Sequence, residues 1–260
     1  MTILENIITF LQFRMKEPQL YGWFHILCIL VVIGLTVFLV YKKYDIKRTL
    51  LILSIIMLVF ELYKQLSFSF SNGKWEYQWY AFPYQFCSVP MYVAFVASLV
   101  KNKRVEKCLF GFLASFGLVA GIGVMVYPIT VFIEETLINV QTMVHHGFMV
   151  VIGFTLILNG HVKLNYKTVL NGLWVFIIAV AVAISVNIIT YHIGFEGGLE
   201  LFYISPYHTS TLPVFDLIHS KVAYPIFLFL YILAFTLGGL IPIYFVKLIK
   251  KLIKKSVDEN

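Results

Sequence analysis

The sequence has few charged residues, few cysteines and no polar stretch long enough to form a soluble domain. Only 13% of its 260 residues are charged and 60% are hydrophobic, whereas soluble domains have about 25% and 45–50%. This composition excludes a water-soluble fold. The 17% of aromatic residues, with only 16 Gly and 8 Pro, excludes disorder and collagen. The three cysteines, Cys28, Cys87 and Cys108, lie inside apolar runs, so no disulfide framework is predicted.

Apolar runs fill most of the chain. A helix needs about 20 apolar residues to cross a bilayer, and seven runs approach or exceed that length: 22–40, 49–70, 83–100, 106–126, 139–158, 168–191 and 222–246. We therefore predict an all-α membrane protein, a bundle of seven transmembrane helices that forms a single integral membrane domain over residues 1–260. Residues 3–15 mix polar and apolar positions at helical spacing, which predicts a short interfacial helix lying on the bilayer.

The basic residues predict the orientation of this bundle. When seven spans are threaded in order, one side of the membrane receives the basic clusters at 42–48, 101–107, 163–167 and 247–255. The positive-inside rule makes that side cytoplasmic, so the N-terminus is expected outside and the C-terminus in the cytoplasm. The net charge of +7 then reports orientation, and no nucleic-acid partner is expected. We expect a multi-pass protein of the cell membrane with phospholipids as partners; the sequence identifies no protein partner.

Polar residues gather in the outward half of the second, third, fifth and sixth predicted spans. An ionisable group inside a span costs about 2.5–3.5 kcal/mol, so it needs a partner, water or a function. The residues concerned are Glu61, Lys64, Cys87, His145, His146 and Asn187. Their shared depth predicts a polar cavity that opens outward. As an alternative, Glu61 and Lys64, which are three residues apart, can simply neutralise each other.

Cys87 is the cysteine best placed to react. It lies in the segment FPYQFCSVPMY, which opens the third predicted span, and we predict Pro83 in the first helical turn and a kink at Pro90. The positive end of the helix dipole favours the nucleophilic thiolate there. Cys28 and Cys108 have only apolar neighbours in sequence and are predicted to be small core residues.

The adjacent residues His145 and His146 lie at a depth similar to that of Cys87 in the predicted bundle. Neighbouring helical residues point about 100° apart, so one imidazole can face the cavity and the other a neighbouring helix. Gln141 and Thr142, one turn earlier, are candidate orienting partners. A thiol, an imidazole and an orienting group are the components of nucleophilic acyl transfer. A packing role for both histidines is the alternative.

The longest connection, residues 192–221, is rich in Tyr and His. Long loops in compact proteins are usually functional, so this segment is predicted to be a lid or substrate rim, with an exposed aromatic belt as the alternative. Tyr203 and Tyr207 lie within it, and Tyr191 directly precedes it.

Three short motifs carry a family resemblance. They are PYQFC at 83–87, the pair His145 and His146, and Asn187 followed by Tyr191. In these motifs and in helix order the chain resembles the YwaF-type family of seven-helix bacterial membrane proteins. That family is similar to mammalian membrane acyltransferases acting on ether phospholipids. The resemblance implies that Cys87 accepts a fatty acyl group and that one of the two histidines is its base. The loop YISPYHTSTLP departs from the family, whose loop is richer in Pro and Ser.

The leading hypothesis is a membrane-embedded phospholipid acyltransferase or acyl hydrolase that works through a thioester on Cys87. Tyr84, Gln85 or Asn187 would donate a hydrogen bond to the oxyanion, and Lys64 would bind a phosphate. Glu61, Tyr191, Tyr203 and Tyr207 complete the predicted substrate-binding set. We expect no cofactor and no metal. Either His145 or His146 fits the role of the base, and either acyl transfer or hydrolysis fits the pattern.

Two other classes of function also fit the sequence. The first is a zinc-dependent lipid hydrolase with His145, His146, His192 and His208 as ligands, although no HxxxH or HExxH spacing occurs. The second is a non-enzymatic receptor or transporter that binds a small ligand or lipid in the outward cavity. No lysine lies within the last span to form a retinal Schiff base, and no repeated halves indicate a transporter.

Overall fold

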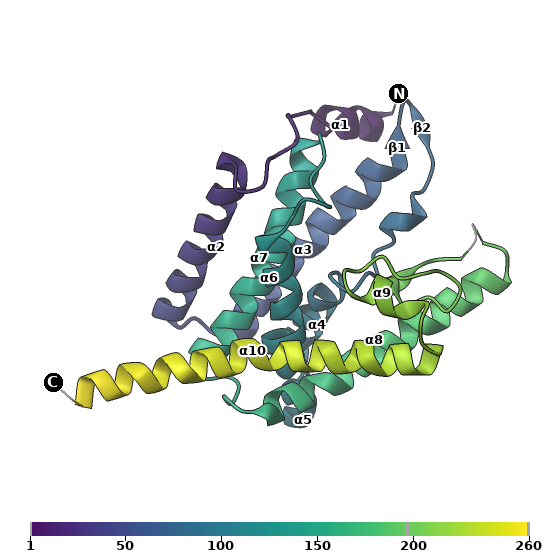
Figure 1. Cartoon of the computed structure of the whole chain (residues 1–260). Helices are drawn as coiled ribbons and strands as arrows, with labels where there is room; N and C mark the ends of the chain where they lie inside the picture. The colour runs from purple at the N-terminus through teal and green to yellow at the C-terminus, as the bar shows by residue number, and fades with distance from the viewer. Residues whose placement is uncertain (1, 196–197, 259–260) are drawn as a thin grey trace.

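A computed structural model describes residues 2–195 and 198–258 as a bundle of long helices (Figure 1). Six helices in these ranges are long and apolar enough to cross a membrane. They are α2 (Trp23–Lys42), α3 (Ile46–Ser69), the helix Lys103–Val126 built from α5 (Lys103–Phe112), η2 (Leu113–Gly117) and α6 (Leu118–Val126), α7 (Thr136–Leu158), α8 (Tyr166–His192) and α10 (Tyr224–Asp258). They correspond to six of the seven predicted spans and confirm a multi-pass membrane protein.

The third predicted span differs from the other six. Its helix, α4, covers only Val89–Leu99, 11 residues, or about 16 Å at 1.5 Å per residue. The prediction of a helix over 83–100 is therefore wrong at its start, and Pro83 lies ahead of the helix. Pro90 is in the first turn of α4, where its missing N–H removes no hydrogen bond. Pro90 thus helps to begin a helix that it was expected to kink.

The N-terminal segment forms the helix α1 (Ile3–Leu11), four residues shorter than the predicted 3–15. The Thr2 hydroxyl accepts from the Glu5 amide and the Glu5 carboxylate accepts from the Thr2 amide, a capping box that fixes its start. Its apolar residues Ile3 and Phe10 are 81% and 79% exposed. The Gln12 side-chain amide ends the segment by donating to backbone carbonyls near the end of α3.

Short elements fill the connections. They are the antiparallel pair β1 (Phe70–Ser71) and β2 (Lys74–Trp75), the turn η1 (Trp79–Ala81), and η3 (Leu201–Tyr203) and α9 (Phe215–His219) between α8 and α10. In Figure 1 the β1–β2 hairpin lies beside α1 at one end of the bundle.

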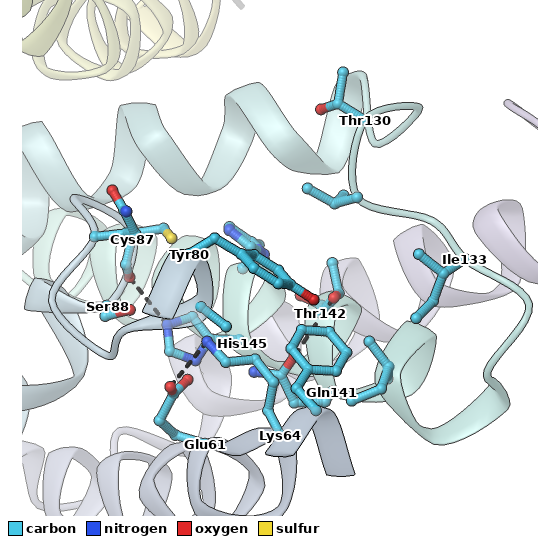
Figure 2. Close-up of a pocket in the computed structure, with 16 residues that line it drawn as sticks. Glu61, Lys64, Tyr80, Cys87, Ser88, Thr130, Ile133, Gln141, Thr142 and His145 are labelled. Atoms are coloured by element: carbon cyan, nitrogen blue, oxygen red, sulfur yellow. Dashed lines mark hydrogen bonds and ion pairs between the residues drawn. The ribbon is translucent and has the colours of Figure 1, made fainter. Parts of the chain in front are cut away.

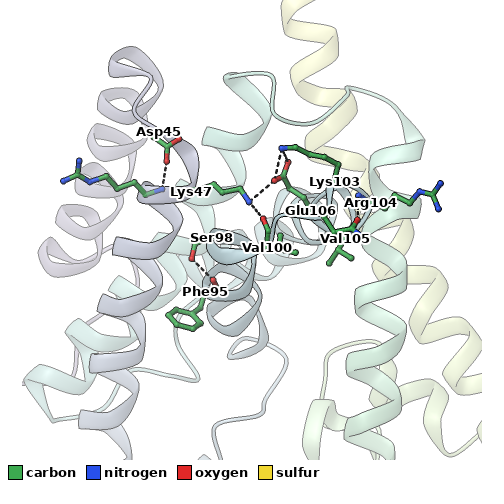
Figure 3. A network of polar contacts seen from close by, with 11 residues as sticks. Asp45, Lys47, Phe95, Ser98, Val100, Lys103, Arg104, Val105 and Glu106 are labelled. Atoms are coloured by element: carbon green, nitrogen blue, oxygen red, sulfur yellow. Dashed lines mark hydrogen bonds and ion pairs between the residues drawn. The ribbon is translucent and has the colours of Figure 1, made fainter.

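Three basic connections meet at the other end of the bundle, which we call the basic end: residues 42–48, 100–107 and 161–167. Lys47 forms an ion pair with Glu106 at 2.9 Å and donates to the Val100 carbonyl (Figure 3). The Phe110 and His161 rings pack edge to face, with centroids 6.3 Å apart. Three basic clusters separated in sequence are therefore neighbours in space.

Small residues bring the helices of the core close together. A Cβ atom on Gly111 of α5 would lie 2.5 Å from the Thr168 carbonyl oxygen and 2.8 Å from the Gly172 nitrogen of α8. Just beyond this contact, η2 is a single π-helical turn, and its Ser115 hydroxyl donates to the Gly111 carbonyl. Such turns absorb an extra residue inside a helix. Packing in the middle of this span is thus backbone against backbone.

Candidate active site

A cavity of about 340 Å³ lies among α3, the turn ahead of α4, α7 and the loop ahead of α7 (Figure 2). Six of the predicted catalytic and substrate-binding residues line it, namely Glu61, Lys64, Gln85, Cys87, His145 and His146, together with the two predicted orienting residues, Gln141 and Thr142. The other predicted site residues, Tyr84, Asn187, Tyr191, Tyr203 and Tyr207, lie outside its lining. The structure thus brings the thiol, both imidazoles and the charged pair into one space.

Cys87 lies in the turn 85–88, which ends where α4 begins. The Ser88 amide donates to the Gln85 carbonyl and closes this turn. The Tyr92 hydroxyl reaches back from α4 to the Pro83 carbonyl at 2.8 Å, which fixes the entry of the chain. Because α4 starts at Val89, the thiol precedes the helix and lies near its positive end.

His145 is oriented by the residue that carries the thiol. Its Nε2 atom lies 2.9 Å from the Cys87 backbone carbonyl oxygen. Since a carbonyl only accepts, Nε2 must carry the hydrogen, and Nδ1 is left with a lone pair. Nδ1 is buried and has no hydrogen-bond partner among the described residues. The expected partner, Gln141, lines the same cavity but does not orient this ring.

His146 has the opposite tautomer. Its Nδ1 donates to the Thr142 backbone carbonyl at 2.8 Å, one turn earlier in α7. The expected hydrogen bond to Thr142 therefore goes to the main chain. The two imidazole centroids are 5.5 Å apart, and both side chains line the cavity. Although adjacent residues of a helix point in different directions, both histidine side chains therefore face the same cavity.

Glu61 and Lys64 form an ion pair in the cavity wall. The Lys64 ammonium lies 2.8 Å from Glu61 Oε1, and the two side chains are 17% and 6% exposed. The Gln65 side-chain amide donates to the same carboxylate oxygen at 2.8 Å and to the Ala81 carbonyl. Glu61 Oε2 has no hydrogen-bond partner within the described ranges. The pair neutralises itself and leaves one carboxylate oxygen open (Figure 2).

The loop after α8 is fastened to the Cys87 turn. Gln85 Oε1 accepts from the Phe202 amide at 3.1 Å. Asn187 holds the preceding residue, Leu201, by accepting from its amide at 2.8 Å and donating to its carbonyl at 3.0 Å. Both the oxygen and the nitrogen of the Asn187 side-chain amide are thus hydrogen-bonded to Leu201. Burial raises the pKa of the Tyr203 phenol in the same loop.

The aromatic residues of this loop stack on the end of α8. The rings of Tyr191 and Tyr207 are 3.7 Å apart and nearly parallel, and the Tyr207 hydroxyl is 2.9 Å from His192 Nε2. Phe202 and Tyr203 have φ values of 60° and 57°, a conformation that is uncommon for bulky residues. Gln85 and Asn187 hold this strained pair, so the loop has a defined structure where it meets the Cys87 turn.

A second, more polar cavity of about 540 Å³ adjoins the first. The two share Phe68, Tyr80 and Ile133 as lining residues. The second cavity is also lined by Thr9 of α1, by Arg14 in the connection after α1 and by residues of the loop ahead of α7. Arg14 forms an ion pair with Glu134 of that loop. Sequence reasoning missed this vestibule because its residues come from connections. It also missed Tyr80 and Ser88, although Ser88 directly follows Cys87.

No group of three His, Cys, Asp or Glu side chains within residues 2–195 and 198–258 is arranged to hold a metal ion. His192 contacts Tyr207 in the loop after α8, whereas His145 and His146 line the cavity. The four histidines of the zinc hypothesis are therefore not a ligand set in this part of the chain.

Comparison with known proteins gives one match. Searches of curated proteins and of solved structures found none. The model of the TMEM164 family matches residues 17–244, a range that includes the Cys87 turn, the histidine pair and the loop after α8. A match over this much of the chain means that the protein belongs to the TMEM164 family.

Proposed function

We propose that this protein transfers or hydrolyses phospholipid acyl groups through a thioester on Cys87. The observation that carries the proposal is the shared cavity: the thiol, the hydrogen bond from His145 to the Cys87 carbonyl, and the open Nδ1 atom of His145 lie in one buried space. A nucleophile beside an oriented imidazole is the arrangement that covalent acyl transfer needs. His145 is preferred to His146 because it is tied directly to the Cys87 turn.

In the first half of the reaction, the His145 side chain leaves the Cys87 carbonyl and turns Nδ1, which points away from Cys87 in the structure, toward the thiol. Nδ1 takes the thiol proton, and the sulfur attacks the ester carbonyl carbon of a phospholipid. The C–S bond forms and the bond from the carbonyl carbon to the glycerol oxygen breaks. That oxygen takes the proton from His145, and a lysophospholipid leaves. Gln85 lines the cavity, unlike Tyr84 and Asn187, and is the preferred donor to the oxyanion, to which its Nε2 would turn from the Glu200 carbonyl 3.5 Å away.

In the second half, the hydroxyl of a lysophospholipid acceptor, or water, gives its proton to Nδ1 and attacks the thioester carbonyl. A C–O bond forms, the C–S bond breaks, and the proton returns to the sulfur. Lys64 lies in the same wall, paired with Glu61, and would bind a lipid phosphate by exchanging that carboxylate for the phosphate. The adjoining polar cavity would give the headgroup a path into the site.

The proposed orientation places the basic end in the cytoplasm and the cavity toward the outer leaflet. The basic connections at 42–48, 100–107 and 161–167 meet at one end, and the positive-inside rule assigns such an end to the cytoplasm. Thiol labelling of single cysteines introduced at positions 44 and 72 in intact cells tests this orientation. Position 72 should react with a membrane-impermeant reagent, and reaction at position 44 instead would reverse it.

Acyl transfer in proteoliposomes tests the proposed chemistry. The donor is a phospholipid with a labelled acyl chain, and the acceptor is an unlabelled lysophospholipid. Cys87→Ala should abolish both transfer and hydrolysis, whereas the matched variants Cys28→Ala and Cys108→Ala should keep activity, since these half-buried thiols do not line the cavity. Full activity in Cys87→Ala would refute the proposal.

The two histidines give a second comparison. His145→Ala removes the open Nδ1 atom and should reduce turnover by about 100-fold or more, the usual contribution of a general base. His146→Ala should have a smaller effect because His146 is tied to its own helix. A larger loss in His146→Ala, with the protein still folded, would move the base to His146.

A further inference from the structure

A second cavity with a different chemistry lies near the basic end. It is a groove of about 490 Å³ between the last turns of α2 and the first turns of α3. Leu35 and Leu39 of α2 and Ile52 and Leu53 of α3 give it an aliphatic lining. Arg48 at its mouth is 13 residues from Glu61 along α3, about 20 Å at 1.5 Å per residue. The groove is therefore separate from the Cys87 cavity and independent of the function proposed for it.

Basic residues outnumber acidic ones four to one in the segment 42–48, which contributes Asp45 and Arg48 to the lining of the groove. The Asp45 carboxylate, which also lines the groove, accepts from the Arg48 backbone amide and caps α3. Lys47 points instead to Glu106 and the Val100 carbonyl (Figure 3). The Arg48 side chain is exposed, and none of the residues that the structure describes forms an ion pair with its guanidinium.

Aliphatic walls below a cationic mouth match the two parts of an anionic phospholipid. A hydrocarbon chain gains from contact with Leu, Ile and similar side chains, and a guanidinium binds phosphate with paired hydrogen bonds. Lys42 and Lys43 directly precede Tyr44, which lines the groove, and add two positive charges to the same connection. Basic pockets between transmembrane helices are known to favour acidic lipid headgroups.

We propose that this groove binds an anionic phospholipid from the leaflet at the basic end, with its phosphate on Arg48 and one acyl chain along Leu39 and Ile52. The site selects net negative charge in the headgroup, so phosphatidylglycerol binds and phosphatidylcholine with the same chains is discriminated against. The bound lipid fills the space between α2 and α3 where these helices leave their connecting turn.

Native mass spectrometry of the full chain, titrated with each of these two lipids, tests the site. The wild type should retain phosphatidylglycerol in preference to phosphatidylcholine. Arg48→Gln should weaken that retention by about fivefold, the effect of one basic residue near a lipid headgroup. The matched control is Arg104→Gln, because Arg104 is exposed at the same end but does not line the groove. This variant should bind like the wild type.

Ile52→Trp tests the groove itself. Ile52 is 48% exposed, so the larger side chain fits without disturbing the core, and it should displace the acyl chain while Arg48 stays in place. Loss of phosphatidylglycerol in this variant supports the site. Equal losses in Arg48→Gln and Arg104→Gln, unchanged retention in Ile52→Trp, or no preference in the wild type would each overturn the proposal.

Discussion

Removing the Lys64 ammonium should destabilise the protein more than neutralising its partner, Glu61. The Glu61 side chain is 6% exposed and that of Lys64 17%, so Lys64→Met leaves a buried carboxylate with only the Gln65 amide as a donor. Breaking a buried pair from one side costs about 3–5 kcal/mol. The remaining hydrogen bond from Gln65 puts the expected loss at the lower end, about 3 kcal/mol.

The reverse substitution, Glu61→Gln, leaves Lys64 near water and keeps an oxygen for Gln65, so it should cost only about 1–2 kcal/mol. The double variant contains no buried charge and should lie within about 1 kcal/mol of the wild type. Equilibrium unfolding of the four proteins in mixed micelles gives the cycle. Lys103→Met is the control: its pair with Glu106 has the same i,i+3 spacing, but its side chain is 78% exposed, so its effect should stay below about 1 kcal/mol. A double variant as unstable as the sum of the two single variants would refute this reasoning.

Three further predictions concern the loop and the helix contacts. Asn187→Leu leaves the Leu201 amide and carbonyl without their partners and should lower the free energy of unfolding by about 2–3 kcal/mol. Limited proteolysis should then cut the loop after α8 sooner. An unchanged cleavage rate would contradict the anchoring role of Asn187. Gly172→Val places methyl groups against the backbone of Gly111 and Phe112, 2.5–2.8 Å from a Cβ at this position, and should prevent normal folding, as measured by elution and thermal unfolding. Gly34→Val, at a position with open space, is the control. Burial raises the pKa of the Glu200 carboxyl, so its ionisation opposes folding: stability is greatest below the unfolded-state pKa and falls as pH rises through the folded-state pKa. Glu200→Gln should therefore be more stable than the wild type at pH 7 and match it near pH 4, and a gap that does not change with pH would contradict this.

The long helices could be predicted from the sequence because continuous apolar runs determine them. Six of the seven runs became helices with ends within a few residues of the prediction, apart from α10, which continues to Asp258. The third run failed because composition does not show where a proline stands relative to a helix start. Pro90 would kink a helix that began at residue 83, whereas in a helix that begins at Val89 the same proline lies in the first turn and is tolerated.

The cavity lining was partly predictable for a similar reason. Glu61, Cys87 and His145 stand out as polar positions in apolar runs of the sequence, and counting residues from the predicted helix ends places them at a similar depth. The partner of each side chain was not predictable, because His145 is held by a backbone carbonyl 58 residues away and not by its helical neighbour Gln141. The role of Asn187 was also hidden, since its contacts lie in a loop whose path no periodicity describes.

The central claim is tested most directly by mass spectrometry of the peptide that contains Cys87. The protein is first incubated with a phospholipid that carries an isotope-labelled acyl chain, with no acceptor present, and the reaction is then quenched in acid. The account predicts a mass increase of one acyl group on the peptide that contains Cys87, removed by hydroxylamine as a thioester is and lost when a lysophospholipid acceptor is added before the quench. Acyl transfer that proceeds at the full rate while Cys87 remains unmodified, or a label found on Cys28 or Cys108, would contradict it.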